Sequence, residues 1–104
     1  MIVHRFTETD GTFPIADTND SAVVQPRLGD HRTGIFHCQQ TNATATYVLL
    51  YGSMDGETGA YVLLHTFTAL DTDTTAVGSA VVTLFPYMYV DQSQTGSIRA
   101  YIGE

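Results

Sequence analysis

The feature that most constrains this chain is a predicted hairpin between residues 44 and 68. Two apolar runs, 47–51 and 61–64, flank a turn that contains Asp55-Gly56. Asp-Gly is a strong turn signal, because glycine adopts positive φ without a Cβ clash and aspartate hydrogen-bonds to nearby backbone. Both arms are apolar at nearly every position. This pattern predicts strands covered on both faces, one by the core and the other by a partner or a chain segment, with a plain sandwich interior as the simpler alternative.

The rest of the chain also favours strands over helices. No long window places apolar side chains at the i, i+3, i+4, i+7 spacing of a helix, whereas threonine, valine and aromatic residues, which suit a pleated sheet, are abundant. The sequence therefore predicts an all-β fold: an antiparallel β-sandwich, jelly-roll or Ig-like, of seven to eight short strands, with an extended N-terminal arm. The strands are expected near 2–6, 22–25, 34–39, 44–52, 60–68, 79–85, 87–91 and 97–102.

The two ends of the chain differ in pattern. At the C-terminal end, Ile98, Ala100 and Ile102 alternate with polar or aromatic residues, which predicts a half-buried final strand. Residues 1–43 are expected to form an arm and the first strands. Polar turn formers and prolines between residues 7 and 34 suit an extended arm or a long ordered loop. Residues 44–104 are expected to complete the same single domain, since 104 residues suit one core.

Charge and cysteine content exclude several classes of protein. The net charge is -7, lysine is absent and the four arginines are dispersed, so binding to nucleic acid or to an anionic membrane is disfavoured. No apolar run is long enough for a membrane span, and the first residues lack the apolar stretch of a signal peptide. Cys38 is the one cysteine, which rules out an intramolecular disulfide and favours a buried structural thiol.

Catalytic and metal motifs are weak, so we expect no enzyme, no cofactor and no metal. The histidines are scattered, and residues 52–56 lack the Gly-x-Ser-x-Gly spacing of a nucleophile elbow. His37 and Cys38 are neighbours on one predicted strand and point to opposite faces, so they do not form a nucleophile pair. Asp71 and Asp73 begin an oxygen-rich loop, but the residues that complete a calcium loop are missing, which favours a solvated loop and leaves cation binding open.

The tyrosines of the last two predicted strands are the remaining candidates for a binding surface. Tyr87, Tyr89 and Tyr101 could stack on sugar rings, as aromatic side chains do in many β-sandwich modules. Tyrosine is also enriched at protein interfaces, where its ring buries area while its hydroxyl stays hydrated. The absence of tryptophan favours packing in the core and at interfaces between proteins.

Three segments, 47–56, 85–90 and 95–103, resemble small β-sandwich proteins of tailed bacteriophage virions. In such proteins a strand ending in Gly-Ser-x-Asp-Gly leads into a hairpin. A Pro-Tyr-x-Tyr-Val strand follows, and a strand with the pattern Gly-Ser/Thr-apolar-x-Ala-Tyr-apolar-Gly closes the chain. Two departures, an aromatic displaced to Tyr61 and Asp91 in place of a basic residue, argue against carrying over a sugar-binding role.

The resemblance implies a capsid cement (decoration) protein that binds the major capsid protein and stabilises contacts between its subunits. Such proteins are commonly homotrimers on the capsid surface of the virion, and before assembly they would lie in the host cytoplasm. The competing interpretation is a receptor- or glycan-binding module of a phage tail or fibre. We expect Phe6, Phe13 and Ile15 to anchor the arm on the capsid, and Tyr87, Tyr89 and Tyr101 to contribute to subunit contacts.

Overall fold

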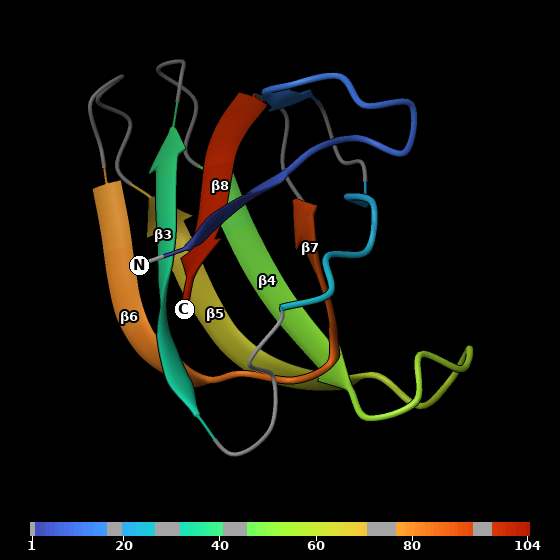
Figure 1. Ribbon diagram of the computed structural model, residues 1–104. Coiled ribbons are helices and arrows are strands. Elements are labelled where there is room, and N and C mark those ends of the chain that lie inside the picture. Colours follow the sequence, from blue (N-terminus) through green and yellow to red (C-terminus); the bar gives the residue numbers. More distant parts are fainter. Residues whose placement is uncertain (1, 17–19, 27–31, 41–45, 71–76, 93–96) are drawn as a thin grey trace.

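The computed structural model describes residues 2–16, 20–26, 32–40, 46–70, 77–92 and 97–104. This part of the chain contains strands and no helix, and it forms two antiparallel sheets packed face to face (Figure 1). The predicted all-β sandwich is confirmed. Its strands are β1 (Val3–Phe6), β2 (Ile15–Ala16), β3 (Thr33–Gln40), β4 (Thr46–Ser53), β5 (Val62–Leu70), β6 (Val77–Thr83), β7 (Tyr87–Gln92) and β8 (Ser97–Gly103).

The strand order is that of a jelly roll. One sheet has the order β1-β8-β3-β6, with β2 also paired to β8, and the other has the order β5-β4-β7. Residues 20–24 extend the second sheet, because Asp20 bridges to Asp91 and Val24 bridges to Met88 on the free side of β7. The predicted strand near 22–25 is therefore present as isolated bridges. The strand pairs are nested along the chain: β1 pairs with β8, residues 20–24 with β7, β3 with β6 and β4 with β5. This nesting is the double Greek key of a jelly roll.

The core lies between the two sheets and follows the period-two alternation of the strands. On β8, Ile98, Ala100 and Ile102 are buried, which confirms the predicted face of this strand. Gln92 is also fully buried, and its Nε2 donates a hydrogen bond of 3.1 Å to the carbonyl oxygen of Ile15, which links the two sheets. The other apolar members of the core are Phe6, Ile15, Phe36, Cys38, Val48, Leu50, Val82, Leu84, Met88 and Val90.

The N-terminal segment is part of the sandwich. Phe6 pairs with Ala100 and Ile15 pairs with Ile98, so β1 and β2 follow one another along the same side of β8. Residues 7–14 form the loop that connects β1 to β2. The backbone N–H of Ala22 donates to the carbonyl oxygen of Thr7 at 2.7 Å, which fastens the loop to the second sheet. Of the two predicted alternatives, the long ordered loop describes these residues, and the extended arm does not.

The turn between β4 and β5 is built by the Gly-Ser-x-Asp-Gly motif. The backbone N–H groups of Asp55 and Gly56 donate to Ser53 Oγ at 3.3 and 3.0 Å, and the N–H of Glu57 donates to Asp55 Oδ1 at 3.0 Å. Gly56 has a φ of 74°, a conformation that glycine adopts without strain. The predicted role of Asp55-Gly56 in this turn is confirmed, and the turn extends beyond the two sheets (Figure 1).

Candidate interaction surfaces

Among the described residues there is no cavity or cleft, and no three His, Cys, Asp or Glu side chains are close enough to hold a metal ion. The same residues contain no helix long and apolar enough to span a membrane. Asp71 and Asp73, which the sequence left open as cation ligands, lie outside the described residues. The candidate surfaces are therefore described on the two outer faces of the sandwich.

The outer face of the five-stranded sheet carries a row of exposed apolar side chains. Val3, Gly103, Ile35 and Val81 are successive cross-strand partners on β1, β8, β3 and β6, and partners across a sheet point to the same face. Val3, Ile35 and Val81 are 57%, 42% and 73% exposed. The glycine between them leaves the row without a side chain on β8. We call these residues the apolar row.

A second row beside the apolar row is polar and aromatic. Arg5, Tyr101, His37 and Ser79 are cross-strand partners on β1, β8, β3 and β6, two residues along each strand. His37 Nδ1 and Ser79 Oγ are 2.7 Å apart. The Arg5 guanidinium lies 4.4 Å from the centre of the Phe13 ring, and that ring packs edge-on against Tyr101 with 5.8 Å between ring centres. The loop 7–14 thus covers part of this row with Phe13.

The five-stranded sheet differs in charge from the rest of the chain. Its strands contain the arginines Arg5 and Arg99 and no aspartate or glutamate, although the whole chain has a net charge of -7. The outer face of this sheet therefore carries the apolar row together with Arg5, two residues along β1 from Val3, and Arg99, four residues along β8 from Gly103, on an acidic protein. Such a surface matches a partner that presents apolar side chains together with carboxylates.

The outer face of the other sheet carries a tyrosine cluster. The rings of Tyr51 on β4 and Tyr89 on β7 are stacked with 5.0 Å between centres, and Tyr61 meets Tyr89 edge-on at 4.9 Å. Burial is the main cause that raises the pKa of Tyr61 and of Tyr89, and the negative charge of nearby carboxylates adds to it. These half-buried rings form the tyrosine cluster, on the side of the molecule opposite to the apolar row.

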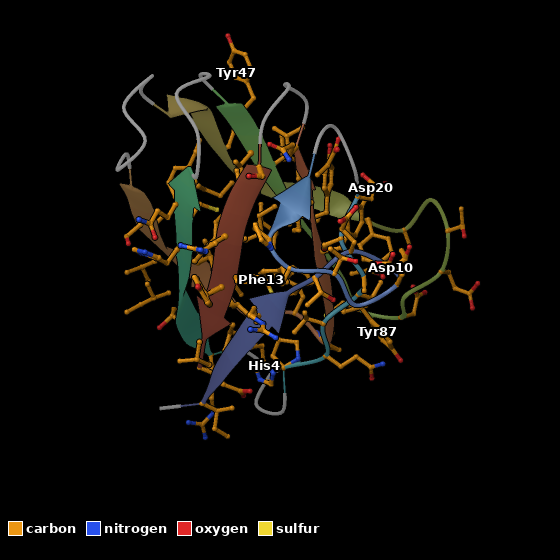
Figure 2. All side chains as sticks on the ribbon, turned by 90° about the horizontal axis from the view of Figure 1, so that it is seen from above. His4, Asp10, Phe13, Asp20, Tyr47 and Tyr87 are labelled. Carbon is orange, nitrogen blue, oxygen red and sulfur yellow. The ribbon has the colours of Figure 1, made fainter. Side chains whose placement is uncertain are left out.

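Two carboxyl groups meet beside the tyrosine cluster. Asp20 bridges to Asp91 along the side of β7, and Figure 2 places Asp20 on the same side of the molecule as Tyr87. Partial burial raises the pKa of the Asp91 carboxyl above its ordinary value of 3.8, and a side-chain hydrogen bond and repulsion from Asp20 raise it further. None of the described arginines lies on β4, β5 or β7, so no arginine of these strands neutralises the pair.

The structure places the predicted anchor residues differently from the expectation. Phe6 and Ile15 are fully buried in the core, so they stabilise this domain and are not exposed to a partner; that part of the prediction is wrong. The reason is that β1 and β2 pair with β8, which turns both side chains inward. Phe13 is half-buried at the surface, between Arg5 and Tyr101.

The predicted interface tyrosines do not share one surface. Tyr87 and Tyr89 lie on the outer face of the three-stranded sheet, next to Tyr51 and Tyr61. Tyr101 lies on the outer face of the other sheet. The sequence did not single out the apolar row, because Val3, Ile35 and Val81 are far apart along the chain and meet only through cross-strand pairing.

The fold and its surfaces define a class: a jelly-roll sandwich whose exposed apolar and aromatic groups lie on the outer faces of its sheets. Cys38 is buried and unpaired, as predicted for a structural thiol, and burial raises its pKa far above the usual range. Neither a scan against protein-family models nor a search of curated proteins finds a match to this chain.

Proposed function

We propose that this protein is a structural virion protein that binds the outside of a phage capsid and stabilises contacts between major capsid subunits. The observation that carries the proposal is the apolar row on a sheet that contains arginines and no acidic residue. We assign the docking contact to this outer face, in place of the N-terminal anchors that the sequence suggested.

Burial of the apolar row supplies the driving force in this proposal. Covering an exposed valine or isoleucine contributes at most about 1.5–3 kcal/mol, and three such side chains form the centre of a small interface. Arg5 and Arg99 on the same outer face would meet carboxylates of the capsid protein and orient the domain. The jelly-roll architecture is compatible with this role, because it is common in viral capsid and lectin domains, although a fold alone does not fix a function.

Co-sedimentation of the purified protein with assembled capsids tests the proposal. We expect saturable binding by the natural protein and a loss of at least about tenfold in affinity for Ile35→Asp, because a charge at the centre of the interface is desolvated. Val23→Asp is the matched control: Val23 is 47% exposed, but it lies on the segment beside β7. The proposal fails if the natural protein does not bind, or if both variants bind as it does.

Deletion of residues 1–16 is not a usable test of capsid binding. The deletion would remove β1 and β2 together with the fully buried side chains of Phe6 and Ile15. Loss of such core side chains costs about 2–5 kcal/mol each, which is comparable to the whole stability of a small domain. Failure to bind would then report unfolding, so substitutions on the outer face are required.

The other expectations from the phage resemblance stay predictions. They are a homotrimeric state, a location on the capsid surface after assembly, presence in the host cytoplasm before it, and the absence of enzymatic activity. The trimer is expected on the assembled capsid, and mass measurement on the decorated capsid would check it. Fractionation of infected cells would check the second and third.

A glycan-binding module of a tail or fibre is the second candidate, and the tyrosine cluster favours it. Aromatic faces bind sugar rings by stacking, and Tyr51, Tyr61 and Tyr89 are gathered on one sheet face. However, Tyr51 and Tyr89 stack on each other, which occupies one face of each ring. A glycan array tests this candidate: reproducible binding that is lost in Tyr61→Ala supports it, and silence across the array contradicts it.

A further inference from the structure

The margins of the two sheets differ in how well they are protected against pairing with another strand. At one side of the sandwich, β1 and β2 are short, separated by a loop and carry Arg5, and the second sheet ends in the bridged segment 20–24. Short strands, interruptions and charges all oppose edge-to-edge pairing. This side is therefore a poor template for an added strand.

The opposite side ends in two strands without a charged residue, β5 and β6. The pairing of β5 with β4 is interrupted by register shifts at two places, and such irregularities twist an edge and disfavour further pairing. In contrast, β6 pairs with β3 in one continuous register from Thr33↔Thr83 to Gln39↔Val77. Its other side has no strand partner among the described residues, and β6 lies at the margin of its sheet (Figure 1). β6 is the least protected edge in this part of the chain.

The sequence of β6 is complementary to a second copy of itself. In an antiparallel pair related by a two-fold axis at Val81, Val81 lies opposite the partner's Val81 and Ser79 lies opposite the partner's Thr83. Valine pairs and serine–threonine pairs both stabilise cross-strand neighbours. Val81 is also the most exposed of the large apolar side chains described, at 73%, because its row has Ile35 on one side and nothing on the other.

We propose that β6 pairs with β6 of a second copy of this chain, so that two five-stranded sheets join into one continuous sheet. Pairing would satisfy the free backbone groups of β6 and continue the apolar row from Val81 into the second copy. Each copy has a net charge of -7, but β6 and its neighbour β3 contain no Asp, Glu, Lys or Arg, so like charges do not meet at the contact. This proposal is independent of capsid binding.

Disulfide trapping tests the register of this contact. Directly opposite residues in antiparallel strands have Cα atoms about 4.5–5.5 Å apart, which is within the range of a disulfide. With oxidised glutathione as the oxidant, we expect Val81→Cys to form a covalent dimer, while the natural protein does not, because Cys38 is buried. Val3→Cys is the matched control, at the far end of the same row. Equal cross-linking of the two variants, or none in Val81→Cys, would contradict the proposal.

Sedimentation of the free protein tests the stoichiometry. We expect a reversible dimer of twice the 11.3 kDa protomer, with a tighter dimer at higher salt because the net charges are screened. Val81→Lys should raise the dimer Kd by at least about tenfold, whereas Val3→Lys should leave it unchanged. A protein that stays monomeric at high concentration, or that forms a trimer insensitive to Val81→Lys, would overturn the proposal. Neither result depends on whether a capsid is bound.

Discussion

At the scale of single residues, three positions with buried or half-buried surroundings allow direct tests of the structure. Asp91 lies partly buried beside a second carboxyl, Gly34 lies where two strands approach closely, and Cys38 faces the core. The sequence predicted that Cys38 is buried, because a lone cysteine outside any catalytic or metal motif favours a structural thiol. It did not predict the meeting of Asp20 and Asp91, because that contact depends on a bridge between distant segments.

Replacement of Asp91 by asparagine should stabilise the protein at neutral pH. The pKa of Asp91 is raised above 3.8 in the folded state, mainly by burial and then by Asp20. Its contribution to stability is therefore fully present below the pKa of the unfolded chain and is lost as the pH rises through the folded value. Urea unfolding should show Asp91→Asn more stable than the natural protein at about pH 7, and the difference should shrink at about pH 3.

Asp10→Asn is the control, because the pKa of Asp10 is shifted in the opposite direction to that of Asp91. Hydrogen bonds from Thr12 lower the pKa of the exposed Asp10 carboxyl, so its contribution is present above the unfolded pKa and is lost as the pH falls. This variant should not be more stable than the natural protein at neutral pH. A natural protein at least as stable as Asp91→Asn at about pH 7 would contradict the assignment of Asp91.

Gly34→Ala should destabilise the fold by about 1–3 kcal/mol, because a Cβ has no room at this position. The added carbon would meet the carbonyl oxygen of Gly103 and lie 2.7 Å from Leu84 Cδ2. Chemical denaturation measures the change, with Thr33→Ala on the exposed neighbouring residue as the control. An unchanged midpoint for Gly34→Ala would show that β3 and β8 are further apart than the structure has them.

The Cys38 thiol should be inert in the native protein. Its side chain is fully buried, and its raised pKa leaves almost no thiolate at neutral pH. A disulfide reagent such as DTNB should therefore react only when denaturant unfolds the chain. Rapid reaction of the native protein would place Cys38 at the surface and contradict the packing of β3.

At the scale of elements, the local sequence pattern was sufficient to predict structures that depend on residues close together in the chain. The β4–β5 hairpin, its Asp55-Gly56 turn and the alternation of β8 follow from such patterns, and all are confirmed. Both faces of the hairpin were predicted to be covered, one by the core and the other by a partner or a chain segment, and cover by a partner stays a prediction. The structure shows a core face and an outer face on which Leu49 is half-buried and Leu63 is exposed. Pattern alone could not place β2, because two residues carry no period.

The relation between β1 and β2 yields a prediction about the loop 7–14. Phe6 pairs with Ala100 and Ile15 pairs with Ile98, so one residue is enough to span the gap along β8. A chain in which a single threonine replaces residues 7–14 should fold into the same sandwich, with a loss of about 1–3 kcal/mol from the missing Phe13 contacts and hydrogen bonds.

An NMR amide spectrum of the shortened protein checks this expectation. Retained dispersion, with protected amides on β8, is the expected result. A collapsed spectrum would show that the loop is required for the fold. If the shortened protein folds, its capsid binding would also show directly whether Phe13, the one predicted anchor at the surface, contributes to attachment.

At the scale of the whole molecule, the jelly roll separates two chemically different faces. The five-stranded sheet presents the apolar row together with Arg5 and Arg99, and the three-stranded sheet presents the tyrosine cluster with Asp20 and Asp91. Composition predicted an acidic chain with few basic residues but could not show that the strands of one sheet are free of acid. That segregation arises from the nested strand order, which brings β1, β8, β3 and β6 together.

A cryo-electron microscopy map of capsids incubated with the purified protein tests the central claim most directly. We expect density of jelly-roll domains at regular positions on the shell, with the outer face of each β1-β8-β3-β6 sheet turned toward the capsid subunits and Ile35 buried in the contact. Bare capsids at saturating protein, or domains attached by the tyrosine cluster with the apolar row facing solvent, would contradict it.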